Sequence, residues 1–281
     1  MRFINVLPKF SNNWSIICVA FVTSMVYLWT LQRNIVGICE YDYCADIGEF
    51  QIALPLWGTV HHTGYPLYML LGSPFVNLLA LFGVAPTTGA SLYSFIWQLG
   101  AVLLLVWLVR RLSRSNVVAV GIGAAFAFIE PIWMHAVIAE VYSLSMFFGV
   151  VILYLAFRLK RNWSDSLGWA LALVCGLAIF HHRLLIFLIL GTAIYLLPTA
   201  WRTPRFWRWS GIAILCAAAG FLPYLDIPLR MWMGSAWTYS QENTWAAFWH
   251  VFNAAEESQR QLRVVDSLAA LREAVLEVGQ T

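Results

Sequence analysis

The sequence has few charged residues: Asp, Glu, Lys and Arg make up 11% of its 281 residues, whereas 61% are hydrophobic. Because about a quarter of the residues in a soluble domain are charged, this composition excludes an ordinary soluble protein. It predicts an all-α, polytopic transmembrane helical bundle. The net charge is only +3, and the basic residues form short clusters between apolar runs. That pattern argues against nucleic-acid binding and indicates which loops stay in the cytoplasm.

Several sequence motifs for nucleotide and hydrolytic chemistry are also missing. The sequence has no P-loop, no dinucleotide-binding glycine motif after a strand, no HExxH motif and no GxSxG motif. No cysteine pair has metal-ligand spacing, and we expect no cofactor, although a divalent metal is compatible with the sequence. Cys39 and Cys44 both lie in the first loop, and they either form a disulfide or remain two free thiols. An externally facing membrane enzyme of this kind would need an activated substrate already in the bilayer, such as a lipid-linked phosphate donor.

Apolar runs define the expected membrane spans. The segment 66–84 contains glycine, proline and asparagine, and a full crossing there would place Arg110 and Arg111 on the wrong side. We therefore expect this segment to be interfacial or re-entrant. The remaining expected spans are Trp14–Leu31, Ala90–Val109, Val117–Val137, Val141–Phe157, two short arms between Ser166 and Pro198, and Gly211–Leu229.

This topology divides the chain into two parts. Residues 1–230 form the predicted transmembrane module, with a long extracytoplasmic first loop that carries interfacial helices. Residues 231–281 form an extracytoplasmic or interfacial tail, the expected start of a further C-terminal region, with an amphipathic pattern from Glu256 to Glu277. The predicted location is a bacterial plasma membrane, with the active site outside the cytoplasm.

The stretch from Cys44 to Leu71 places acids and histidines in a chain otherwise suited to lipid, where polar groups are costly unless they are used or satisfied. Asp46 and Glu49 are three residues apart, so a helix would project both carboxylates from one face until Pro55 ends it. This pattern predicts an active-site loop at a membrane surface. A helix N-cap for Asp46 and a solvated Glu49 remain the structural alternative.

Other ionisable residues converge on the same predicted side. Glu140 lies at the start of a predicted helix, and its carboxylate has two equally weighted roles there, capping of the helix and catalysis. The run His181, His182 and Arg183 is suited to holding a lipid phosphate, because arginine binds phosphate oxygens in a bidentate way, or it is a polar turn. His61 and His62 either bind the same phosphate or order their loop.

These residues resemble the GT-C membrane glycosyltransferases. ADIGEF followed by HHTGYPLY is similar to the acidic and "hPPGYPLF"-type motifs of that superfamily. The branch it resembles is shared by uncharacterised bacterial membrane proteins and a eukaryotic endoplasmic-reticulum protein O-mannosyltransferase. Glu140 lies in an element similar to "AEVYxL", and the run from Gly176 to Leu185 is similar to "GLxxxHH". Thr63 departs from the motif, where a proline is usual.

The resemblance implies a sugar transfer, possibly of mannose, from a polyprenyl-phosphate-linked donor to an acceptor hydroxyl, with inversion at the anomeric carbon. Asp46 would be the general base, Glu49 would orient the acceptor or tune Asp46, and Glu140 would be a third catalytic acid. The expected partners are the lipid-linked donor, a protein or glycan acceptor, and membrane lipids. The expected substrate-binding residues are His61, His62, Tyr65, His181, His182, Arg183 and Arg230.

Two other functions are consistent with the same residues. A transporter or lipid flippase would use the acids and histidines as a proton or substrate path, although the repeated halves typical of transporters are not visible. A histidine-metal membrane enzyme would use the two His-His pairs with Asp46, although the usual metal-ligand spacings are absent.

Overall fold

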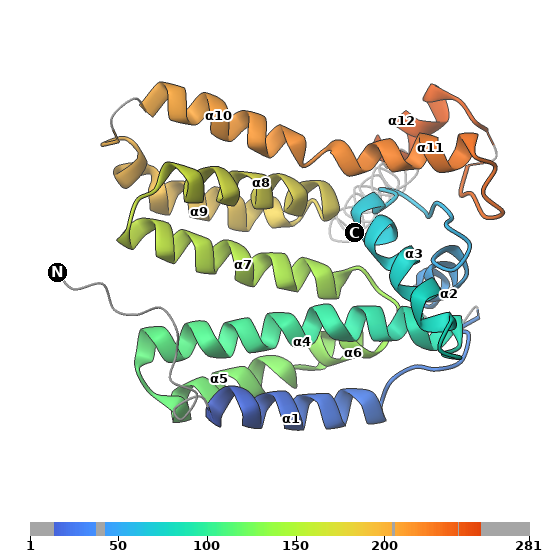
Figure 1. The fold of residues 1–281 in the computed structure, drawn as a ribbon, viewed down its shortest axis with the longest axis horizontal. Helices are drawn as coiled ribbons and strands as arrows, with labels where there is room; N and C mark the ends of the chain where they lie inside the picture. The colour runs from blue at the N-terminus through green and yellow to red at the C-terminus, as the bar shows by residue number, and fades with distance from the viewer. Residues whose placement is uncertain (1–13, 38–42, 204–205, 241, 254–281) are drawn as a thin grey trace, which may run out of the picture.

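The computed structural model describes residues 14–37, 43–203, 206–240 and 242–253, and all the regular secondary structure in these residues is helical. Figure 1 shows the long helices running side by side, as predicted for a polytopic helical bundle. The bundle consists of α1 (Trp14–Trp29), α4 (Pro86–Ser113), α5 (Asn116–Ala127), α7 (Tyr142–Arg161), α8 (Asp165–His181), α9 (Leu185–Ala200) and α10 (Phe206–Ala219).

A set of shorter helices covers one end of the bundle, on the right in Figure 1. Helix α1 ends at this end and α4 begins there, so the segment between them does not carry the chain across the bundle. The expectation that residues 66–84 are interfacial or re-entrant stays a prediction, and this arrangement is consistent with it. The helices at this end are α2 (Tyr43–Ala53), α3 (Pro66–Ala80), α11 (Asp226–Trp232) and α12 (Trp245–Asn253), with the short 3₁₀ helix η2 (Leu222–Leu225) leading into α11.

The opposite end of the bundle carries the basic clusters. Arg110 and Arg111 lie in the last turn of α4, and Arg158, Lys160 and Arg161 lie in the last turn of α7. Both of these turns, together with the end of α9 and the start of α10, lie at the end away from α2 and α3 (Figure 1). The structure therefore separates the positive clusters from the acids of α2, as the predicted topology requires.

Three helical stretches in the described residues are long and apolar enough to cross a membrane: Pro86–Ser113, Tyr142–Arg161 and Phe206–Trp232. The predicted span Val117–Val137 is formed by two helices, α5 and α6 (Glu130–Val137), which together are apolar enough to cross a membrane but meet at a bend of 68°, so this stretch is a broken span or a re-entrant loop. Pro131 explains the break, since its ring and missing N–H cannot continue a helix from Ala127. Helices α1, α3, α8 and α9 are shorter apolar helices, and α8 and α9 are the two short arms predicted around His181 to Arg183.

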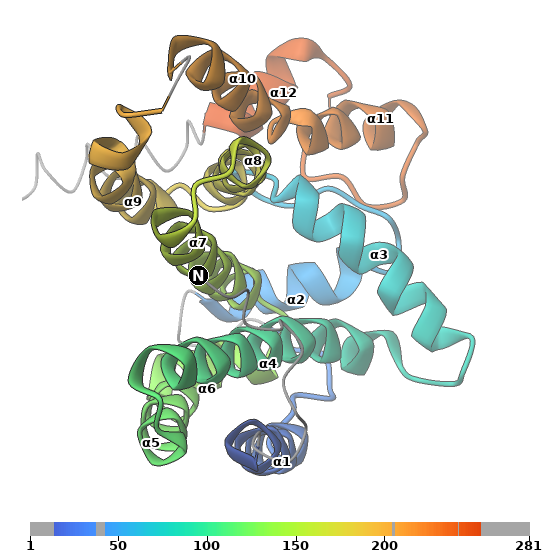
Figure 2. The ribbon, with the colours of Figure 1, turned by 60° about the vertical axis from the view of Figure 1, so that its left-hand side comes forward.

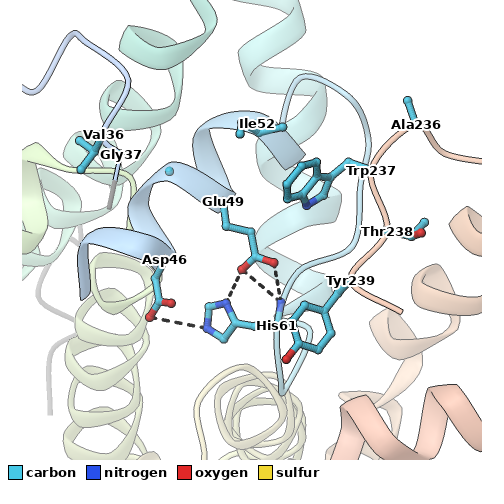
Figure 3. A pocket seen from close by; sticks show the side chains of 11 residues that line it. Val36, Gly37, Asp46, Glu49, Ile52, His61, Ala236, Trp237, Thr238 and Tyr239 are labelled. Atoms are coloured by element: carbon cyan, nitrogen blue, oxygen red, sulfur yellow. Dashed lines mark hydrogen bonds and ion pairs between the residues drawn. The ribbon is translucent and has the colours of Figure 1, made fainter. Parts of the chain in front are cut away.

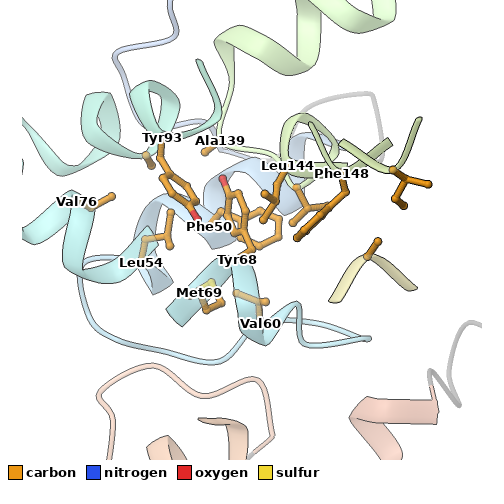
Figure 4. Packing of buried hydrophobic residues seen from close by; sticks show 14 of the residues in the cluster. Phe50, Leu54, Val60, Tyr68, Met69, Val76, Tyr93, Ala139, Leu144 and Phe148 are labelled. Carbon is orange, nitrogen blue, oxygen red and sulfur yellow. The ribbon is translucent and has the colours of Figure 1, made fainter. Parts of the chain in front are cut away.

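Helix α7 lies centrally in the bundle and packs against α4, α8 and α9 (Figure 2). The largest buried cluster joins this helix to α2 and α3 through aromatic and aliphatic side chains, among them Phe50, Tyr68 and Leu144 (Figure 4). Burial of these side chains holds α2 in place with about 2 kcal/mol for each large side chain. The apolar core therefore continues to the base of the helix that carries Asp46.

Candidate active site

Helix α2 places two carboxylates at the covered end of the bundle. Asp46 and Glu49 are three residues apart, and both side chains point toward the same cavity (Figure 3). They differ in exposure: the side chain of Asp46 is 44% exposed and that of Glu49 is 14% exposed. The helix ends at Ala53, before Pro55, as the sequence predicts. Asp46 is therefore the more accessible of the two acids.

His61 lies between these acids (Figure 3). Its Nδ1 is 2.5 Å from Oε2 of Glu49, and its backbone N–H donates to the two Glu49 oxygens over 3.1 and 3.3 Å. Its Nε2 lies 3.8 Å from Oδ2 of Asp46. Burial by itself lowers the pKa of His61, but the hydrogen bond to Glu49 and the charges of Asp46, Glu49 and Glu140 raise it above its ordinary value. The cationic form of His61 is therefore favoured beside Asp46.

A cavity of about 780 Å³ opens in front of Asp46, Glu49 and His61. Its volume is in the range of small-molecule binding sites, about 300 to 1,000 Å³. Figure 3 shows that the wall opposite α2 comes from a segment far away in the sequence. The residues that line the cavity are Val36, Gly37, Asp46, Gly48, Glu49, Ile52, His61, Ala236, Trp237, Thr238 and Tyr239.

The opposite wall is held by backbone contacts with the loop after α2. The N–H of Thr59 donates to the carbonyl of Trp237 over 3.1 Å, and the N–H of Tyr239 donates to Oγ1 of Thr59 over 3.0 Å. Gly58 allows this approach, because a Cβ there would lie 2.6 Å from the Trp237 carbonyl oxygen. The segment 235–239 is thus fixed over the cavity and contributes to its shape.

The turn before α3 joins the cavity to the core. Gly64 has φ +83°, and Tyr65 caps α3 in the left-handed region with φ 38°. The Tyr65 ring lies 5.5 Å from the ring of His61 and 6.2 Å from that of His181, measured between centroids. His181 is 1% exposed and its Nε2 donates to the carbonyl of Val141 over 3.1 Å. Tyr65 therefore lies beside the acid and histidine group, whereas His181 belongs to the core beneath it.

Glu140 is buried in the connection between α6 and α7. It is 2% exposed, its Oε2 accepts from the N–H of Val141, and Ser94 Oγ bonds its backbone N–H and carbonyl. Burial, followed by the negative charge of Asp46, raises the pKa of Glu140 to about 8. The protonated form is therefore favoured at neutral pH. The N–H of Val141 belongs to the N-cap residue of α7 and the helix has no side-chain cap, so the capping and the catalytic role of Glu140 both stay predictions.

The remaining expected binding residues lie outside the cavity lining. His62 faces Tyr239, with ring centroids 6.3 Å apart, and His182 lies 5.2 Å from the Tyr142 ring. Arg183 is exposed at the same end of the bundle. It donates to the carbonyl of Phe252 and its guanidinium lies 5.6 Å from the centre of that ring.

Arg230 is also outside the cavity lining. It is 4% exposed and is paired with Asp226 one helical turn earlier. Its guanidinium lies 5.2 Å from the Trp57 ring centre, and its Nη1 donates to Ser73 Oγ over 3.4 Å. Arg230 therefore joins α11 to α3 and to the loop that follows α2.

The cavity wall formed by Val36, Gly37 and residues 236–239 is not among the site residues expected from the sequence. Val36 and Gly37 are apolar residues without a motif, and residues 236–239 are separated from Asp46 by most of the chain. The cluster of Trp237, Thr238 and Tyr239 after the last apolar run is the signal that could have identified them. Cys39 and the amphipathic pattern 256–277 lie outside the described residues, so the disulfide and the tail helix stay predictions.

The bundle and the cavity define the class of protein: a polytopic helical membrane protein with a cavity, lined by two acids and a histidine, at one end of its helices. The chain belongs to the family described as the protein O-mannosyl-transferase TMEM260 N-terminal domain, whose model matches residues 46–205. This confirms the resemblance drawn from the motifs. The matched range includes Asp46, Glu49 and His61 and ends before Arg230 and the segment 235–239.

A mouse protein named Protein O-mannosyl-transferase TMEM260 is 26% identical over 229 residues. The aligned part covers 79% of this chain and 31% of the mouse protein, so the chain spans about a third of the length of that curated relative. No solved structure matches the chain. The relative is eukaryotic, and the bacterial plasma membrane and the extracytoplasmic site stay predictions.

Proposed function

We propose that this chain transfers a sugar from a polyprenyl-phosphate-linked donor to a hydroxyl group of a protein or glycan. The observation that carries the proposal is the half-exposed Asp46 carboxylate, open to a cavity of about 780 Å³ at one end of a membrane bundle. The family supports this choice, since its mouse member is named a protein O-mannosyl-transferase. Mannose is accordingly the sugar that we propose.

Asp46 is the general base of the proposed reaction. The acceptor hydroxyl attacks the anomeric carbon while its proton passes to the Asp46 carboxylate. The bond between that carbon and the phosphate oxygen breaks, and its electron pair leaves with the polyprenyl phosphate. Attack opposite to the leaving group inverts the anomeric configuration. A carboxylate in this position contributes about 10² to 10⁴-fold to the rate.

The donor phosphate requires positive charge at the same end of the bundle. Arg183 is exposed there and is held by a carbonyl group and an aromatic ring, which leave its charge available to a phosphate. We assign the phosphate to Arg183, with His62 and His182 as neighbouring donors. Tyr65 orients the substrate, whereas His181 and Arg230 support the site from the core. In this proposal the extracytoplasmic side is the covered end of the bundle.

The reaction as proposed uses no metal ion. Both oxygens of Glu49 are already engaged by His61, which leaves Asp46 as the accessible carboxylate of the pair. The chemistry of glycosyl transfer from a lipid phosphate is complete with a base and a cation. Transfer should therefore persist when a chelator is present.

The proposal is tested with the purified 281-residue chain in lipid nanodiscs. Radiolabelled polyprenyl-phosphate mannose is supplied with a serine- and threonine-containing peptide, and GDP-mannose replaces the lipid donor in a parallel reaction. We expect labelled peptide only with the lipid donor, with or without EDTA. A folded chain that labels no acceptor, or one that uses the nucleotide sugar, would contradict the proposal. Movement of the lipid across the bilayer of sealed proteoliposomes, without sugar transfer, would instead identify a flippase.

A further inference from the structure

Glu49 and His61 form a pair in which the orientation of the histidine ring is fixed. Glu49 accepts from the backbone N–H of His61 and lies 2.5 Å from its Nδ1. Because an ionised carboxylate only accepts hydrogen bonds, Nδ1 carries a hydrogen and donates it to Glu49. The hydrogen bond at one ring nitrogen determines what the other can do. The second nitrogen, Nε2, is the atom that faces Asp46.

Aromatic side chains hold the same ring from its sides. The centroid of the His61 ring lies 5.8 Å from that of Phe50 and 5.5 Å from that of Tyr65, both in edge-to-face arrangements. The side chain is only 18% exposed. A rotation of the ring would lose the Glu49 hydrogen bond and disturb both contacts. His61 therefore presents Nε2 to Asp46 in a single orientation.

The distance between Asp46 and His61 decides on which side of the sugar His61 acts. Groups that work on opposite sides of an anomeric carbon stand about 6.5 to 9.5 Å apart in inverting glycoside hydrolases. The separation here is 3.8 Å, too short for a sugar to lie between Asp46 and His61. Both side chains also line the same cavity (Figure 3). His61 thus stands on the acceptor side with Asp46, away from the departing phosphate.

We infer that Glu49 and His61 are positioning residues, with Glu49 holding His61 as an imidazolium cation whose Nε2–H orients the Asp46 carboxylate toward the acceptor hydroxyl. This inference rests on the proposed function. Neither residue accepts the proton from the substrate. Glu49 acts through His61, and His61 acts through Asp46.

The inference predicts a dependence on pH, because His61 orients Asp46 in its cationic form. The hydrogen bond to Glu49 and the negative charges of Asp46 and Glu49 favour that form, and the pKa of His61 is raised above its ordinary value even though burial opposes it. The cation is present at low pH and is lost as the pH rises through this raised pKa. The titratable groups that face His61 are Asp46 and Glu49 on α2, Glu140 between α6 and α7, and His62 and Tyr65 in the turn before α3.

The first test follows the titration of His61 by NMR in detergent-solubilised protein with ¹³C-labelled histidine, and the His61→Asn variant assigns the signal. We expect Glu49→Gln to lower the midpoint by about one pH unit or more, because it removes a hydrogen-bonded negative charge. Asp46→Asn should also lower the midpoint. The matched control, Glu242→Gln, changes an exposed acid of the outer loop and should leave the midpoint in place. An unmoved midpoint in Glu49→Gln would overturn the inference.

The second test measures sugar transfer across pH. Glu49→Gln should lower kcat about ten-fold or more and leave KM for the lipid donor within about two-fold, since the base is displaced but the donor site is intact. The basic limb of its kcat profile should move to lower pH with the NMR midpoint, and His61→Asn should abolish that limb. A loss of kcat with an unmoved limb would reduce the pair to a structural role and overturn the inference.

The two proposals fail in different ways. A wild-type chain that transfers no sugar would contradict the proposed function. An active wild type with an active, pH-unaltered Glu49→Gln variant would contradict the positioning role alone. In either case, the NMR titration tests separately whether Glu49 and Asp46 raise the pKa of His61.

Discussion

At the scale of single residues, the neighbours of an acid decide what it can do. Asp46, Glu49 and Glu140 are chemically similar carboxyl groups within one site, yet their surroundings differ. Asp46 is 44% exposed to the cavity, Glu49 is clamped by His61, and Glu140 is 2% exposed and bonded to the Val141 N–H. Only Asp46 combines access with a neighbouring cation. The proposal that Asp46 is the base rests on these differences.

The buried Glu140 should make the stability of the protein depend on pH. Its pKa of about 8 in the folded state lies above the ordinary value of 4.5, so the protonated form stabilises the fold. That contribution is complete below about pH 4.5 and is lost as the pH rises toward 8. We expect the melting temperature, measured in an uncharged detergent, to fall as the pH rises from about 4.5 to 8. Glu140→Gln should flatten the fall, because its amide is uncharged and its carbonyl can still accept from Val141.

The matched control is Glu130→Gln, which changes an exposed acid in the first turn of α6. This variant should keep the pH dependence of the wild type. A Glu140→Gln variant that melts with the same pH dependence as the wild type would show that the buried carboxyl does not titrate as described.

The sequence was sufficient to predict that Asp46 and Glu49 lie close to a histidine, but not which of the other expected site residues are buried. The spacing of Asp46 and Glu49 on a helix, followed by a histidine turn, was sufficient to expect them together, and His61 does lie between them. The burial of His181 and Arg230 could not be predicted in the same way. Their sequence neighbourhood shows a polar residue near a helix end, whereas their burial depends on α3, α7 and other elements distant in the chain.

At the scale of helices, short and broken elements build the covered end of the bundle. The end of α2 before Pro55 was predicted from the sequence. The two short helices on either side of the His181 to Arg183 run, α8 and α9, were predicted as well. The bend between α5 and α6 was not predicted, although Pro131 is the residue that interrupts the run. Contacts between helices distant in the sequence, such as α8 with α10, required the structure.

The packing of α8 on α10 depends on Gly176. A Cβ at Gly176 would lie 2.0 Å from the carbonyl oxygen of Ala217, and one at Gly220 would lie 2.2 Å from the Gly176 carbonyl carbon. Gly176→Ala should therefore push the helices apart and destabilise the protein by about 1 to 3 kcal/mol, the usual cost of overpacking. Gly191→Ala in α9 is the control, because nothing lies within 4 Å of that Cβ. Thermal melting in detergent should separate the two variants, and equal melting temperatures would refute the close approach.

At the scale of the whole molecule, the bundle has two chemically different ends. The basic last turns of α4 and α7 lie at one end, and the cavity with Asp46 lies at the other (Figure 1). This arrangement was predictable from the positive clusters alone, because positively charged loops stay in the cytoplasm. The wall formed by residues 235–239 was not, since it depends on backbone contacts with the loop after α2.

Accessibility in intact cells or sealed vesicles tests this polarity. Single cysteines replace Thr238 and Arg183 at the covered end, and Ser113 and Arg202 at the basic end, in a chain whose own cysteines are changed to serine. A membrane-impermeant maleimide added from outside should label the first pair, and labelling of the second pair should require permeabilisation. Labelling of Thr238→Cys and Arg183→Cys from opposite sides would exclude a shared site.

The most direct test of the central claim compares the turnover of Asp46→Asn with that of Asp165→Asn in the nanodisc transfer assay. Asp165 is an exposed acid in the first turn of α8, at the opposite end of the bundle, so its variant controls for the same chemical change. If Asp46 takes the proton from the acceptor, Asp46→Asn should lose at least about 100-fold in kcat while Asp165→Asn stays within about two-fold of the wild type. A folded Asp46→Asn variant with the turnover of the wild type would contradict the account.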